Sequence, residues 1–442
     1  MPRFRLFAAG TASVLAVALL AAWSWWPSEA ELAQRVAALA SRRLGVGVQV
    51  GALHWQLLPR PQLELREVQT EQPEPVVLQR LRAEPRLLAL LQGRVVLERL
   101  TLDGGRIPQR SLAAWKRTGQ ADGSDGDDGG DGNAQQGPEG VPAVELAHLA
   151  FDGVTWISHS GVPVVYAGEA ELDADQRLRQ ARLWRPGVEP PADIRITRED
   201  PASGAAGAAP DAPQRFGLQV RLAGGTAQGW AQVASQADGR LQLTGALSPR
   251  GVEVQAALAA FNRRSPVAGR ADGETQLAAE GAQALELAQR LRTDTRFTMA
   301  PATVLGFDLQ RTIDTLGREH AGQTRLERLG GRVQTQNVPQ QGMAIRFDDL
   351  HATAGRFSAR GSARLQQRRL QAVAAVDLVD GVVGVPMRIE GPLGRLQVTV
   401  SKAPLVGAAA GTAVLPGIGT AIGAAIGRLL GGGEDTQAPP AR

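Results

Sequence analysis

Apolar and polar residues alternate at consecutive positions in several segments of the second half of the chain. This period of two constrains the fold most, because successive side chains of a β-strand point to opposite faces of a sheet. After residue 214, apolar residues alternate with Gly217, Gln219 and Arg221. The alternation recurs over 241–247 and 252–258, where Ala256 and Leu258 are the last apolar members. The pattern predicts strands with one apolar and one solvated face.

Five more strands are expected at short spacing: Met343–Phe347, Phe357–Leu365, Leu370–Leu378, Pro386–Glu390 and Leu396–Val400. This spacing favours an antiparallel meander. Its apolar face must be covered by a second sheet, by helices or by a bound apolar ligand. The apolar residues of these strands and of the earlier alternating strands are candidates for a lipid-binding groove. They are Phe216, Leu218, Val220, Leu222, Leu241, Leu243, Val252, Val254, Met343, Ile345, Phe347, Val376, Leu378, Ile389 and Val398.

Helices are expected where apolar residues recur at helical spacing, at about 282–292 and 308–318. A further helix should begin after Ser28, which with Glu31 has the spacing of a capping box, and should end at Gly45. The N-terminal part also contains segments that favour strands and one helical turn. These strands are expected at 46–50, 53–58, 63–68, 76–81 and 95–102, and the turn at 85–91.

An uncharged apolar segment near the N-terminus is long enough for the roughly 20 residues that a helix needs to cross a bilayer. Arg3 and Arg5 precede it and acidic residues follow, so its short N-terminal end should stay in the cytoplasm. The alternative is a cleaved signal peptide; either way the body is exported. The predicted membrane-anchor residues are Leu6, Phe7, Leu15, Leu19, Leu20, Trp23, Trp25 and Trp26.

Three segments have compositions unlike the strands. Residues 119–142 are rich in Gly and Asp and should form a flexible acidic linker, and residues 186–214 should form a Pro-, Ala- and Gly-rich surface loop. The uncharged tail over 403–427 has glycines at every fourth position, the spacing of close helix contacts in membranes. It should either dip into a membrane as a hairpin or cover the apolar face. The tail glycines are Gly407, Gly411, Gly419, Gly423 and Gly427.

Composition argues against several functional classes. The net charge is only +4, and Arg is interleaved with acidic residues along the whole chain, which disfavours nucleic-acid binding. There is no Cys, and the five His residues have no metal-binding spacing. No residues have the spacing of a catalytic triad, a calcium loop or a dinucleotide site. The sequence therefore predicts a protein that is not an enzyme and holds no cofactor or metal. Aromatic residues make up only 4%, which favours a thin or open β structure over a thick core.

Two parts of the chain resemble the AsmA family of envelope proteins. The first part, within 40–117, contains RRLGVGVQVGALHWQLLPRPQLELREVQT and PRLLALLQGRVVLERLTLDGGRI. The second, within 266–402, contains TVLGFDLQRTID, IRFDDLHATAGRFSARGSARL and VDLVDGVVGVPMRIEGPLGRLQVTVSK. The resemblance implies an elongated curled sheet with an apolar inner face, anchored in the inner membrane of a Gram-negative bacterium with its body in the periplasm. It also implies a part in phospholipid transport or outer-membrane biogenesis.

The expected fold class is thus α+β, mainly antiparallel β, with a few short helices and one N-terminal transmembrane helix. Expected partners are the inner membrane and a phospholipid or other acyl-chain ligand. The alternative function is an assembly or scaffolding factor that binds outer-membrane or secretion proteins without carrying lipid. The expected organisation is an anchor (1–27), an N-terminal module (28–118), the acidic linker (119–142), a middle β region (143–265), a C-terminal meander (266–402), the Gly-rich tail (403–432) and a disordered end (433–442).

Overall fold

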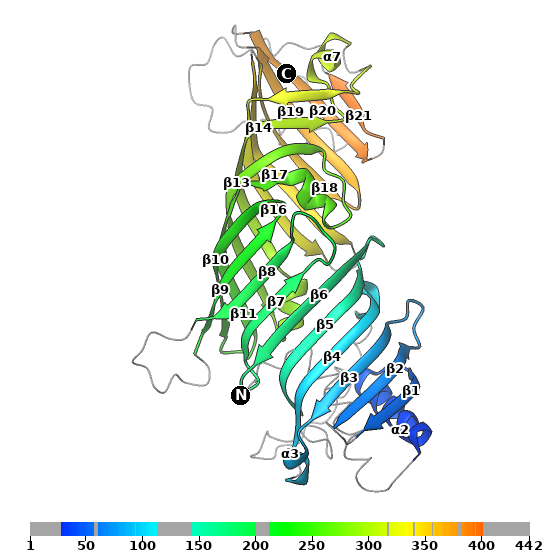
Figure 1. Ribbon diagram of the computed structural model, residues 1–442. Helices are drawn as coiled ribbons and strands as arrows, with labels where there is room; N and C mark the ends of the chain where they lie inside the picture. The colour runs from blue at the N-terminus through cyan, green and yellow to red at the C-terminus, as the bar shows by residue number, and fades with distance from the viewer. Residues whose placement is uncertain are drawn as a thin grey trace, which may run out of the picture.

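The structure is a computed structural model that describes residues 28–56, 61–92, 94–112, 144–199, 212–315, 318–338, 341–355, 357–378, 382–393 and 395–400. Its strands form a single 21-stranded sheet, with a few short helices (Figure 1). The prediction of a mainly antiparallel β protein is therefore confirmed.

The strands follow one another across the sheet in chain order. The first ten are β1 (Val48–Gln56), β2 (Gln62–Thr70), β3 (Val77–Pro85), β4 (Val95–Pro108), β5 (Val144–Ile157), β6 (Pro163–Leu172), β7 (Leu178–Trp184), β8 (Asp193–Arg198), β9 (Gln214–Leu222) and β10 (Gly225–Ser235). The others are β11 (Leu241–Arg250), β12 (Val252–Glu253), β13 (Val267–Gly281), β14 (Arg292–Leu305), β15 (Gln323–Leu326), β16 (Arg328–Val338), β17 (Gly342–Ala354), β18 (Phe357–Gln366), β19 (Arg369–Leu378), β20 (Val382–Pro392) and β21 (Gln397–Val400).

Neighbouring strands pair antiparallel, except that β4 and β5 are parallel. Parallel neighbours need a connection that returns the chain to the other end of the strand. The acidic segment over 119–142 belongs to this connection, between Pro108 and Val144. In sequence, the acidic segment therefore connects β4 and β5, which are adjacent strands of the same sheet. β11 and β12 both pair with β13, and β15 and β16 both pair with β14, so each of these pairs forms one row.

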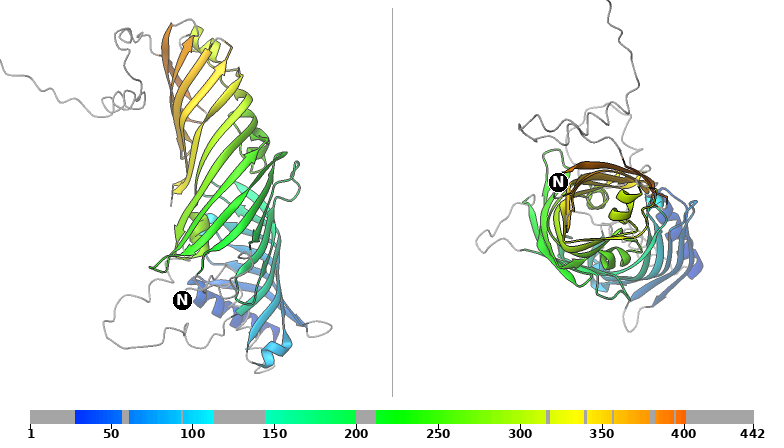
Figure 2. Two further views of the ribbon diagram at one scale, coloured as in Figure 1. Left: turned by 90° about the vertical axis from the view of Figure 1, so that its left-hand side faces the viewer. Right: turned by 90° about the horizontal axis from the view of Figure 1, so that it is seen from above.

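The sheet twists and curls along its length (Figure 2). Register shifts interrupt several strand pairs, among them β13–β14 and β16–β17, and bulges of this kind increase twist. Glycine also lets neighbouring backbones approach closely. A Cβ added to Gly273 would lie 2.5 Å from the backbone oxygen of Arg296. Phe297 pairs with both Gly273 and Gly331 in register, so an aromatic ring has a glycine on each neighbouring strand.

Helix α2 (Glu29–Leu44) forms as the sequence predicts. The Ser28 hydroxyl accepts a hydrogen bond from the Glu31 backbone N–H, and the Glu31 carboxylate accepts one from the Ser28 N–H. Gly45 ends the helix in the left-handed conformation at φ 66°. Leu32 and Val36 are almost fully buried against the first strands, so α2 covers the beginning of the sheet.

Four short helices accompany the later strands: α3 (Leu87–Leu91), α5 (Val254–Ala259), α6 (Ala284–Gln289) and α7 (Leu309–Asp314). The helical turn near 85–91 is confirmed, and α6 and α7 are shorter than expected. In the end-on view of Figure 2, helices lie inside the curl of the sheet. We call the face against which α2, α5, α6 and α7 pack the inner face, and the opposite one the outer face.

The structure corrects three expectations. The two strands expected at 46–50 and 53–58 are one strand, β1, because no turn interrupts the extended backbone at Gly51. The loop expected over 186–214 contains β8, in which Ile194 and Ile196 alternate with charged and polar residues. The strand expected to continue through 254–258 is instead helix α5. Strands β5, β6, β7, β10, β13, β14, β15 and β16 had no counterpart in the sequence predictions.

Within the described part of the chain, no helix combines the length and apolar character needed to cross a bilayer. The membrane anchor predicted over 6–26, the flexible linker over 119–142 and the tail glycines Gly407–Gly427 fall outside the described residues.

Candidate apolar binding face

The apolar residues of the inner face continue from strand to strand because paired residues point to the same side of a sheet. In the N-terminal part, Leu63 pairs with Ala83, and Leu97 of β4 pairs with Leu146 of β5. All four belong to a cluster of buried side chains that also includes Leu32 and Val36 of α2. The inner face therefore starts as an ordinary core beneath α2.

The same face continues through the middle and C-terminal strands. Pairs in register include Phe216–Ala231, Val233–Leu243, Leu243–Ala279, Val333–Phe347, Ala359–Val376 and Ile389–Val398. The predicted groove residues on strands share this face: Phe216, Leu218, Val220, Leu222, Leu241, Leu243, Val252, Met343, Ile345, Phe347, Val376, Ile389 and Val398. Leu378 lies in β19, but its side chain falls outside the described part of the structure.

Short helices cover only parts of this face. Leu287 of α6 packs with Phe216 and Leu241, and Leu309 of α7 packs with Val376. Between these clusters, apolar side chains of the inner face are half-buried, among them Val220, Ile345, Phe347 and Ile389. Leu243 is also half-buried, at the border of the cluster beneath α6. Met343 is 54% exposed. Among the strands that the structure describes there is no second sheet, so these side chains are not packed in a closed sandwich.

Val254 contributes to the inner face from a helix. The Glu253 carboxylate accepts hydrogen bonds from the backbone N–H groups of Gln255 and Ala256, which caps α5. This cap and the Ala-rich composition favour a helix over the expected strand. Val254 packs against the cluster around Met299 and Ala302.

Threonines interrupt the apolar surface in the middle of the sheet. Thr275 and Thr295 pair across β13 and β14, and their hydroxyls are hydrogen-bonded at 2.9 Å. Thr293 and Thr335 do the same across β14 and β16, at 2.7 Å. Because each hydroxyl has a partner, this band adds little polarity to the inner face.

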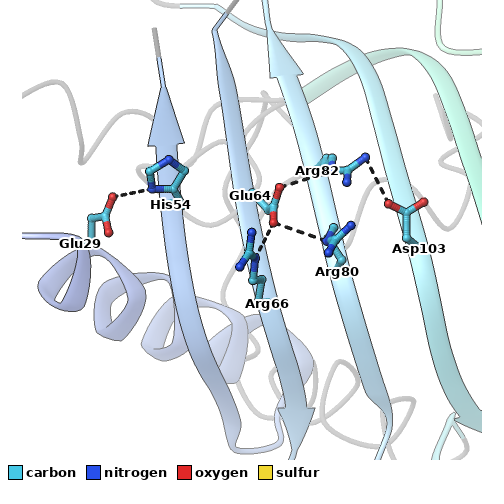
Figure 3. A network of polar contacts seen from close by, with 7 residues as sticks. All are labelled: Glu29, His54, Glu64, Arg66, Arg80, Arg82 and Asp103. Carbon is cyan, nitrogen blue, oxygen red and sulfur yellow. Dashed lines mark hydrogen bonds and ion pairs between the residues drawn. The ribbon is translucent and has the colours of Figure 1, made fainter.

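The outer face carries Arg–carboxylate networks. Around Glu64, Arg66 lies at 2.5 Å, Arg82 at 3.3 Å and Arg80 at 3.4 Å, and Arg82 also reaches Asp103 (Figure 3). Burial opposes ionisation of Glu64, but the hydrogen bonds and charges of these arginines hold its pKa below the ordinary value. An open depression beside this network is lined by polar side chains and Gly104. The charged and polar side chains of this surface suit contact with water.

Another outer-face network surrounds Asp193, whose side chain is only 3% exposed. Arg221 donates two hydrogen bonds to it, at 2.7 and 2.6 Å, and Arg182 donates one at 3.3 Å. The hydrogen bonds from Arg221 are the main reason that the pKa of Asp193 lies below its usual value.

Sequence reasoning missed two polar residues on the inner face, Tyr166 of β6 and Arg185 just after β7. The Arg185 guanidinium carbon lies 5.7 Å from the centre of the Tyr166 ring. The alternation of Arg182 with Leu183, and of Ile194 with Arg195, is the signal that could have placed this region in the sheet.

Nothing in the described residues gathers three or more His, Asp or Glu side chains in a metal-binding arrangement. His54 contacts Glu29 at 3.0 Å near the N-terminus of α2 (Figure 3). The imidazole of His351 is hydrogen-bonded to the backbone of Asp349.

No protein-family model matches the chain, and no curated protein matches its sequence.

Proposed function

We propose that the chain is an AsmA-like envelope protein, without enzymatic activity, whose inner face shields phospholipid acyl chains. One observation carries the proposal: the register keeps apolar residues on one face across the sheet, while helices cover only parts of that face. The segment over 6–26 anchors it in the inner membrane, and the body lies in the periplasm and takes part in lipid transport to, or maintenance of, the outer membrane.

Surface energetics support an acyl-chain ligand. Each buried CH₂ group contributes about 0.8 kcal/mol, so a single acyl chain laid along several strands gains a large binding free energy. The partly exposed Met343, Ile345 and Phe347 lie on one face of β17 and offer such a surface. The sheet has 19 rows of strands, because the short strands β12 and β15 share rows with β11 and β16. It thus extends on the order of 90 Å along its hydrogen-bonding direction.

Photocrosslinking in living cells tests the proposal with matched positions on opposite faces. A photoreactive amino acid replaces Ile345 or Ile389 on the inner face, and Arg346 or Glu390 on the outer face, in the full-length chain. These pairs are sequence neighbours, so they share local structure and differ in the face they occupy. Phospholipid adducts are expected at Ile345 and Ile389 and absent at Arg346 and Glu390.

The assembly-factor alternative gives a different result. If the chain binds outer-membrane or secretion proteins without carrying lipid, protein adducts should form and none of the four positions should give phospholipid adducts. Lipid adducts at equal yield on both faces would also reject the proposal, because they would report contact with a membrane surface instead of shielding.

A further inference from the structure

Arg185 places a positive charge on the inner face. Its backbone N–H donates to the Ala192 carbonyl at 2.9 Å, which extends the pairing of β7 with β8 by one residue. Since side chains alternate along a strand, Arg185 points to the same side as Leu183. Tyr166 also lies on this side. It pairs with Val154 and is two residues from Gly168 on the same strand, so it shares the face of Gly168. The Phe151 side chain covers Gly168 on this face.

Among the described residues, the Arg185 guanidinium has no carboxylate partner, unlike the arginines of the outer-face networks. Its Nε and Nη1 atoms are buried and make no hydrogen bond. On the outer face of the same region, Arg221 donates two hydrogen bonds to Asp193. Buried N–H donors without an acceptor cost free energy, and a bound anion that accepts from this guanidinium would reduce that cost.

The surroundings suit an anion. Burial lowers the pKa of Arg185, yet a guanidinium is so strongly basic that it stays charged at neutral pH. Burial raises the pKa of Tyr166, so its phenol stays protonated and can donate a hydrogen bond. The Arg185 guanidinium and the Tyr166 ring are 5.7 Å apart, so these two donor-bearing side chains are neighbours on the inner face.

Apolar surface adjoins these donors. Leu183, two residues before Arg185 on the same face, is 38% exposed. Leu183 pairs with Ile194, and Ile194 pairs with Val220, so a row of apolar side chains leads away from Arg185 across three strands. A polar head at Arg185 and a chain along this row would together match an amphiphile.

We propose that Arg185 and Tyr166 bind the phosphate group of a phospholipid whose acyl chains lie on the inner face. This inference rests on the proposed function and specifies the ligand class. A phosphate ester supplies acceptor oxygens for the Arg185 N–H groups and the Tyr166 hydroxyl.

Two photoactivatable, clickable probes with identical acyl chains test the inference: phosphatidate and diacylglycerol, which differ in the phosphate. The full-length chain, kept in a non-ionic amphipol, is labelled as wild type, Arg185→Gln, Arg185→Lys and Arg195→Gln. Arg195 lies on the outer face of β8 and is exposed, so its variant removes the same charge from the other side of the sheet. Far-UV circular dichroism and melting temperature monitor folding.

Wild type and Arg195→Gln should prefer phosphatidate over diacylglycerol, and Arg185→Gln should lower this preference about tenfold. Arg185→Lys should keep most of it, because the charge remains. The melting temperature of Arg185→Gln should not fall, since an unpaired buried charge is removed.

Other outcomes separate the two proposals. Equal labelling by both probes in wild type and Arg185→Gln overturns the phosphate site and leaves acyl-chain shielding intact. No labelling by either probe overturns the proposed function itself. If excess inorganic phosphate abolishes the preference for phosphatidate, Arg185 binds the free ion, and the lipid assignment is wrong.

Discussion

At the scale of residues, charged side chains on the two faces of the sheet differ in whether they have hydrogen-bond partners. Asp193 is buried on the outer face and accepts hydrogen bonds from two arginines. Arg185 is half-buried on the inner face, and among the described residues its buried Nε and Nη1 atoms have no hydrogen-bond partner. Removing one partner of a buried, hydrogen-bonded ion pair is destabilising, and a charged group that is buried without a partner costs free energy. Asp193 thus belongs to an ion-pair network of the outer face, whereas Arg185 belongs to the phosphate site that we propose on the inner face.

Asp193→Asn should lower the free energy of unfolding by about 2 kcal/mol at pH 7, allowing for partly exposed partners. The pKa of Asp193 is lowered in the folded state, so its contribution is complete above the ordinary value of about 3.9 and is lost as the pH falls through the lowered value. Urea denaturation at pH 7 and near pH 3 measures the deficit, which should shrink in acid. Glu199→Gln, in an ion pair with about half of each side chain exposed, is the control and should cost far less. Equal costs would contradict the argument.

Gly273→Ala tests the close approach of β13 and β14. The added Cβ would meet the Arg296 backbone oxygen at 2.5 Å, which forces the strands apart and should cost about 2 kcal/mol. In the control Gly217→Ala, the nearest atom is a Glu199 carboxylate oxygen at 3.3 Å on a side chain that can move. Thermal denaturation compares the two variants; a loss as large for Gly217→Ala would speak against strand crowding.

At the scale of elements, short helices act as local covers over the inner face. The clusters beneath α5, α6 and α7 are separate from one another, and each combines one helix with nearby strands. The Glu253 cap of α5 is local, so a variant at this position should loosen one cover without disturbing the whole sheet.

Glu253→Ala removes the carboxylate that caps α5 and should lower stability by about 1 kcal/mol. Hydrogen exchange should speed up in α5 and near Val254, because the helix loses two capping hydrogen bonds. Glu280→Ala, on an exposed outer-face position of β13, serves as the control. Faster exchange throughout the sheet would show that α5 is not a local cover.

At the scale of the molecule, contacts run mainly between consecutive strands. The sheet therefore resembles a repeat protein, in which each repeat contacts only its neighbours. Long proteins of this kind often do not unfold in a single two-state transition. Every Trp precedes residue 231, so tryptophan fluorescence reports the N-terminal half, while far-UV circular dichroism reports all strands. We expect the two urea transitions not to coincide. Coincident midpoints would show that the sheet unfolds as one unit.

Part of the fold and of the candidate face could be predicted from the sequence. Period-two alternation identified β9, β11 and the five last strands, and the capping box identified α2. The alternation also selected residues such as Ile345 and Ile389, which share one face. These successes are local, since the direction of a side chain in a strand depends on its immediate neighbours.

Tertiary structure decided what local pattern could not. The sequence by itself determined that apolar strand faces exist; register determined that they join across the whole sheet. Alternation in Val252–Leu258 is compatible with a strand, and only the Glu253 cap and packing on Met299 select α5. Arg185 looks like any other arginine in the sequence. It becomes distinctive only because β7 and β8 direct it to the apolar side, where its Nε and Nη1 atoms are buried without a hydrogen-bond partner among the described residues.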